Sequence, residues 1–187
     1  MVVTITSKSI DTLYHECLVV GFFSDERPPR GLCGLLDWRL NGTVSRLMAH
    51  DRMSGAFMEK VLVCPECRVP SLRILLIGLG TVKDLTYEKL HRAGFAISET
   101  LSGLRCIDPA IDIPGIGRCT LEPARMTLAV TSGFFDHAVT HAHGENESPS
   151  VNILGKDDQY DEILLGIHEF KVSVKSQTHV HINEMKG

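Results

Sequence analysis

Long apolar runs and an excess of one charge are both missing from this 187-residue chain. No window approaches the roughly 18 consecutive apolar residues that a transmembrane helix requires. Lys and Arg together number 19 against 23 Asp and Glu, which gives a formal net charge of −4. A balance of this kind disfavours broad electrostatic capture of nucleic acid or of an anionic membrane. We therefore expect neither nucleic acid nor a membrane among the partners of the protein.

We also expect no secretory leader, because residues 1–16 do not place an apolar core behind a basic start. A cytoplasmic location is the expectation that follows. In that compartment cysteines are mostly reduced thiols. The sequence contains six of them: Cys17, Cys33, Cys64, Cys67, Cys106 and Cys119. Cys17 and Cys33 lie in apolar runs and are expected to be small core residues.

The composition is that of a folded globular protein, with 43% hydrophobic and 22% charged residues. A chain of this length is the size of one domain. It contains no internal repeat and no convincing linker. We therefore predict a single domain over residues 1–187.

Segments with strand-like and helix-like patterns alternate along the chain. Strands are expected at 2–5 (a short edge strand), 17–23, 60–64, 73–77, 110–113, 151–154 and 172–182 (a closing strand). Helices are expected after Pro28 and Pro29, after the stop signal Asn41-Gly42, at 85–104, from Pro123, and at 157–170. The polar segment 141–149 is expected to be a mobile loop. This alternation predicts a layered α/β domain with a largely parallel sheet.

Two segments resemble a known family. CLVVGFFSDERPPRGLCGLLDWRLNGTVSRLM (17–48) and RILLIGLGTVKDLTYEKLHRAGFAI (73–97) are similar to the N-terminal domain of the leucyl (cytosol) aminopeptidase family. The resemblance is firmest over residues 10–105. It implies a three-layer, macro-domain-like α/β fold: a mixed, mainly parallel sheet with helices on both faces.

In that family the domain precedes a separate catalytic domain that holds two metal ions, and it belongs to large oligomers. The KGxTFDSGG-type and NTDAEGR-type segments of the catalytic domain do not occur in the sequence. The resemblance therefore implies a non-catalytic domain that acts in oligomerisation or in partner or ligand binding. One alternative is an accessory subunit of a separately encoded metallo-aminopeptidase. Macro-type folds also suggest ADP-ribose, but the strand-end Asn motif and the glycine-rich phosphate loop are absent.

Gly78-Leu-Gly80 follows an expected strand and precedes an expected helix, where dinucleotide folds place phosphate. A full fingerprint needs a third glycine at the position of Lys83. Gly78, Gly80 and Thr81 are therefore candidate ligand-binding residues, and a purely structural tight turn is the favoured interpretation.

Cys64-Pro-Glu-Cys67 is the sharpest local motif, because such a turn can present two thiolates to one side, as half of a zinc site. No matched second pair of ligands follows. No cofactor is the main expectation. A zinc or redox module that uses Cys64 and Cys67 is the alternative, beside a reversible disulfide or two unrelated thiols.

The histidines gather late in the chain. His137 and His141 are four residues apart and would share a helix face, and His179 and His181 would project from the same side of a strand. Either pair could bind a metal adventitiously. Surface histidines are the favoured interpretation.

Overall fold

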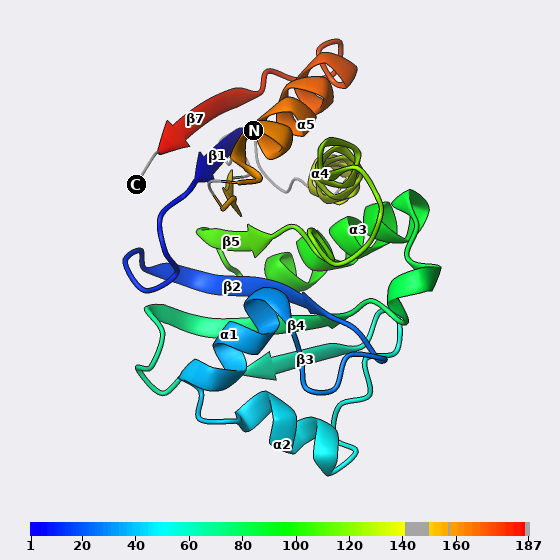
Figure 1. Ribbon diagram of the computed structural model, residues 1–187. Helices are drawn as coiled ribbons and strands as arrows, with labels where there is room; N and C mark the ends of the chain where they lie inside the picture. Colours follow the sequence, from blue (N-terminus) through cyan, green and yellow to red (C-terminus); the bar gives the residue numbers. More distant parts are fainter. Residues whose placement is uncertain (141–149, 157, 186–187) are drawn as a thin grey trace.

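Strands and helices alternate along the chain, as the sequence predicts (Figure 1). The computed structural model describes residues 1–140, 150–156 and 158–185. In order, the elements are β1 (Val2–Thr6), β2 (His15–Phe22), α1 (Gly31–Arg39), α2 (Thr43–Ala49), β3 (Lys60–Val63), β4 (Ser71–Gly78), η1 (Val82–Asp84), α3 (Tyr87–Gly103), β5 (Pro109–Asp112), α4 (Pro123–Thr140), β6 (Ser150–Leu154), α5 (Tyr160–Ser173) and β7 (His181–Met185). The predicted segment 141–149 lies outside the described residues.

The described strands form one mixed sheet in the order β3-β4-β2-β5-β6-β1-β7. Only β3 runs antiparallel to its neighbour, and the other pairs are parallel. The central strands β2 and β4 carry unbroken buried runs at 17–20 and 74–77. Such runs are typical of parallel strands that are covered on both faces. The predicted mixed, mainly parallel sheet is confirmed.

Helices cover both faces of the sheet and complete three layers (Figure 1). One core contains buried residues of α3, α4 and α5, together with Cys17 and Val19 of β2. The other contains buried residues of α1 and α2, together with Leu18 and Val20. Alternate residues of β2 thus enter opposite cores, as the pleat of a strand requires. The three-layer α/β prediction is confirmed.

Two strand predictions were wrong. β1 is not an edge strand, because it pairs with β6 on one side and with β7 on the other. The segment 172–182 is not one strand, because α5 continues to Ser173 and β7 begins only at His181. Val172 and Val174 produced the misleading alternation at a helix end, where Val172 is 73% exposed and Val174 only 7%.

The turn between α1 and α2 has the predicted stop signal. Asn41 and Gly42 have φ values of +55° and +74°, in the left-handed region that Asn and Gly tolerate best. The first helix begins at Gly31, so Pro28 and Pro29 precede its first turn instead of lying within it.

Candidate functional site

The glycine turn after β4 is joined to its neighbours through the main chain. Gly80 has a φ of +76°. Its N–H donates to the Gly55 carbonyl at 2.9 Å, and its carbonyl accepts from the Ser24 N–H at 2.9 Å. The next α-helix, α3, begins only at Tyr87, after the short η1. The turn therefore lies several residues before a helix N-terminus.

The close approach of another loop explains why position 78 is a glycine. A Cβ at Gly78 would overlap the carbonyl oxygen of Ala56. The Gly78 N–H donates to the Glu59 carbonyl at 2.8 Å, and its carbonyl accepts from the Met58 N–H at 2.9 Å. This glycine has a packing role that needs no ligand.

The polar groups that follow the turn already donate hydrogen bonds to carboxylates of the protein itself. The Val82 N–H donates to the Asp25 carboxylate at 3.1 Å, and the Thr81 hydroxyl donates to Asp84 at 2.6 Å. An anionic ligand would have to compete with Asp25 for the amide. Ligand binding by Gly78, Gly80 and Thr81 stays a prediction.

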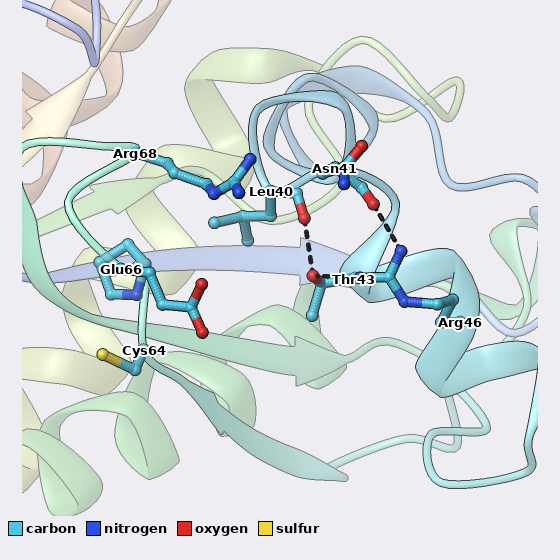
Figure 2. A pocket seen from close by; sticks show the side chains of 8 residues that line it. Leu40, Asn41, Thr43, Arg46, Cys64, Glu66 and Arg68 are labelled. Atoms are coloured by element: carbon cyan, nitrogen blue, oxygen red, sulfur yellow. Dashed lines mark hydrogen bonds between the residues drawn. The ribbon is translucent and has the colours of Figure 1, made fainter.

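Cys64 and Cys67 lie on the turn between β3 and β4, and both are exposed free thiols. Glu66 and Cys67 have left-handed φ values of +48° and +62°. In the part of the chain that the structure describes, no group of three or more His, Cys, Asp or Glu side chains could hold a metal ion. Structural zinc sites use four ligands, so zinc at this pair stays a prediction. Cys64 also lines a cavity next to the α1–α2 turn (Figure 2).

A polar cluster at the amino ends of β2, β5 and β6 was missed from the sequence. The Asp108 carboxylate lies 3.4 Å from Nδ1 of His15 and accepts a 2.6 Å hydrogen bond from the Asn152 amide. Asn152 also donates to the Pro109 carbonyl at 3.1 Å. Nε2 of His15 is buried and has no hydrogen-bond partner among the described residues. The cluster links three strands, and its members are too far apart in sequence to form a motif.

The histidine interpretation needs correction. His137 is 5% exposed, not a surface residue. Its Nδ1 lies 3.0 Å from the Ser98 hydroxyl, and its ring packs edge-on against Phe95. Its proposed companion His141 lies outside the described residues. His179 precedes β7, which begins at His181, so these two do not project from one strand.

The thiols that the sequence placed in the core are buried. Cys17 and Cys33 are 0% and 1% exposed. Burial raises the pKa of Cys33 to about 12, which makes its thiol a poor nucleophile. The interaction with the Cys106 thiol lowers the pKa of Cys17.

A perturbed carboxyl lies at the other end of the sheet, where open α/β folds usually bind ligands. Asp112 ends β5. Burial raises its pKa to about 7, against the opposing charge of Lys156. Arg118 is paired with Glu26, with Nε 3.0 Å from Oε1. The raised pKa makes Asp112 a candidate proton acceptor near neutral pH.

The family model for the N-terminal domain of the cytosol aminopeptidase family matches residues 19–138. This match extends from β2 to nearly the end of α4. The chain belongs to the cytosol aminopeptidase family. A curated relative, the probable cytosol aminopeptidase of Cyanothece sp., is 24% identical over 153 residues, which cover 77% of this chain and 30% of the relative. The chain thus spans about a third or less of the cytosol aminopeptidases that it matches.

Solved structures agree with this placement and show the fold. A mutant tomato leucine aminopeptidase aligns with a TM-score of 0.63 at 20% identity, over 89% of this chain and 35% of that one. A mutant Oceanobacillus iheyensis macrodomain aligns with a TM-score of 0.68 at 12% identity, over 90% and 92% of the two chains. The macro-domain-like fold expected for this cytosol aminopeptidase domain is confirmed. None of the described helices is both long and apolar enough to cross a bilayer.

Proposed function

We propose that this domain is a non-catalytic association module, which binds a second copy of itself. Its family membership supports this proposal, because the resemblance implies a domain that accompanies catalysis without performing it. The segments that supply the family's catalytic lysine and metal carboxylates are absent from the sequence. Two-metal peptidase chemistry depends on such ligands.

The observation that carries the proposal is an exposed apolar group at one end of the sheet. Tyr14, Leu72 and Ile107 are 60%, 51% and 74% exposed. They lie at the amino ends of β2, β4 and β5, which are adjacent strands. Exposed apolar side chains that gather in one place mark interaction surfaces more often than scattered ones do. We call these three residues the amino-end patch.

Light scattering coupled to size-exclusion chromatography tests self-association. The wild-type protein is expected to elute as a defined oligomer, and L72D and I107D are expected to lower its mass towards that of the monomer. A buried charge at an interface is strongly unfavourable. L165D is the matched control, because Leu165 on α5 is 50% exposed and Leu72 is 51% exposed. A monomeric wild type, or variants that keep the wild-type mass, would contradict the proposal.

A second candidate partner is a separately encoded peptidase subunit. This chain covers only about 30% of the first two relatives. In those proteins such a domain is joined to other sequence in one chain, which favours a partner of that kind for this domain. A peptidase that co-purifies with the tagged protein from its native host, and is lost in I107D, would support this candidate.

The names of the relatives also support a cytoplasmic location.

A further inference from the structure

A small cavity lies between two turns of the chain (Figure 2). One turn joins α1 to α2, and the other joins β3 to β4. The cavity has a volume of about 130 Å³. Eight residues line it: Leu40, Asn41, Thr43, Arg46, Cys64, Pro65, Glu66 and Arg68.

Charges of both signs face this cavity without pairing to one another. Among the described residues, neither the Glu66 carboxylate nor the Arg68 guanidinium has a hydrogen bond or an ion pair. Figure 2 shows the Glu66 carboxylate directed into the space opposite Thr43, while Arg68 extends along the opposite side towards Leu40. A negative and a positive group are therefore both available to a ligand.

The wall formed by the α1–α2 turn is held by a chain of hydrogen bonds. Arg46 donates to the Asn41 carbonyl at 2.5 Å and to the Thr43 hydroxyl at 3.0 Å. The Thr43 hydroxyl in turn donates to the Leu40 carbonyl at 2.6 Å. Arg46 keeps its positive charge, and its guanidinium is fixed in place. A wall that is ordered before binding loses less entropy when a ligand binds.

The turn between β3 and β4 adopts backbone conformations that are uncommon for its residues. Glu66 has a φ of +48° and Cys67 of +62°. Left-handed conformations at non-glycine residues cost free energy, and they concentrate at functional sites. Glu66 thus lines the cavity from a left-handed backbone position.

We propose that this cavity binds a small zwitterion, a free α-amino acid. A guanidinium is suited to a carboxylate because of its parallel N–H donors, which places the ligand carboxylate at Arg68. The ligand ammonium then lies at the Glu66 carboxylate, and Leu40 contacts the side chain. The two arginines attract a simple anion and Glu66 attracts a simple cation, but only a zwitterion pairs with charged groups of both signs in the cavity.

The volume sets the size of the ligand. Pockets for drug-sized molecules measure roughly 300–1,000 Å³, and a cavity of about 150 Å³ holds a benzene-sized molecule. At about 130 Å³, the cavity matches an amino acid with a small side chain better than it matches a nucleotide.

Titration followed by amide chemical shifts tests the proposal with L-alanine as the probe. L-Alanine is expected to bind in the millimolar range or tighter and to shift amides in the segments 40–46 and 64–68. Propionate and ethylamine, which each carry one of its charged groups, are expected to bind at least about tenfold more weakly, because each loses one charge-assisted contact. Binding of inorganic phosphate without L-alanine binding would overturn the proposal.

Two variants assign the charged contacts. R68Q and E66Q are each expected to weaken L-alanine binding about tenfold. Both side chains are exposed, so the variants are expected to keep the wild-type spectrum elsewhere. E169Q on α5 is the matched control at an exposed site remote from the cavity, and it is expected to bind as the wild type does. No L-alanine binding to the wild type, or undiminished binding to both R68Q and E66Q, would overturn the proposal.

Discussion

Gly133 of α4 lies directly against the main chain of His91 in α3. A Cβ at position 133 would overlap the His91 carbonyl oxygen and would lie 3.0 Å from the Phe95 nitrogen. The contact is reciprocal, because a Cβ at Gly94 of α3 would overlap the Val130 carbonyl oxygen of α4. The two helices can approach this closely only because each has a glycine at the contact.

We predict that G133A destabilises the fold. The added methyl group meets main-chain atoms, which cannot rotate away, so the helices must separate. Overpacking of this kind costs roughly 1–3 kcal/mol. Urea denaturation followed by circular dichroism measures the change in the free energy of unfolding.

G103A is the matched control for this prediction. Gly103 ends α3, and a Cβ there has no neighbour within 4 Å. Alanine is favoured over glycine in a helix by about 0.5–1 kcal/mol, so G103A is expected to be neutral or stabilising. Equal effects of G103A and G133A would show that helix propensity, not the α3–α4 contact, decides the outcome.

Local patterns were enough to predict most of the architecture. The buried runs of β2 and β4 and the stop signal Asn41-Gly42 depend on neighbours in sequence, and all three were interpreted correctly. The interior place of β1 could not be predicted in this way. Its Thr4 and Thr6 are buried, although their polar side chains do not indicate an interior strand in the sequence. Strand order is decided by pairing with β6 and β7, which come from the far end of the chain.

The candidate sites show the same division. The turns at Gly78 and Cys64 are local motifs, and they were found. The link between His15, Asp108 and Asn152 forms only when three strands align their amino ends, and no spacing in the sequence signals it. The cavity shared by Arg46 and Glu66 likewise requires two turns that are distant in sequence.

Asp112 is expected to make stability fall as the pH rises. Burial raises its pKa from an ordinary value of 3.8 to about 7 in the folded protein. The folded state therefore binds the proton more tightly than the unfolded state does. The contribution of Asp112 to stability is fully present below about pH 4 and is lost as the pH rises to about 7. The full shift corresponds to about 4 kcal/mol, and less where water reaches this partly exposed carboxyl.

The D112N variant tests this dependence. Its amide stays neutral at every pH, so its free energy of unfolding is expected to lose the decline that the wild type shows between about pH 4 and pH 7. At pH 8 the variant is expected to be the more stable protein. Parallel curves for the two proteins across this range, measured by urea denaturation, would contradict the assignment.

Glu59 is expected to have the opposite pH dependence. Burial acts to raise the pKa of its carboxyl, but hydrogen bonds from Ser54 and Gly55 outweigh burial and lower the pKa below its ordinary 4.5. Its oxygens accept from the Ser54 hydroxyl at 2.8 Å and from the Gly55 N–H at 2.6 Å. The stability that Glu59 contributes is present above its unfolded pKa and is lost as the pH falls through the lower folded value.

At neutral pH, E59Q is expected to cost roughly 1–3 kcal/mol, because hydrogen bonds to a charged acceptor are replaced. The loss is expected to shrink as the pH falls below about 4, where the wild-type carboxyl also becomes neutral. E169Q on α5 is the control, with little change expected at either pH. A cost of E59Q that stays constant down to acid pH would mean that the charge of Glu59 does not support the 54–59 loop.

The thiols are expected to react in an order set by exposure. Cys64 and Cys67 are exposed, Cys106 and Cys119 are half-buried, and Cys17 and Cys33 are buried. Titration of the native protein with a disulfide reagent is therefore expected to give a fast phase of two thiols, and denaturation is expected to release all six. The double variant C64S/C67S is expected to lose the fast phase, whereas C119S is expected to keep it.

Addition of zinc before the reagent distinguishes the zinc module from a pair of unrelated thiols, because thiolates bound to the metal react more slowly. A fast phase that survives in C64S/C67S would contradict the order of exposure.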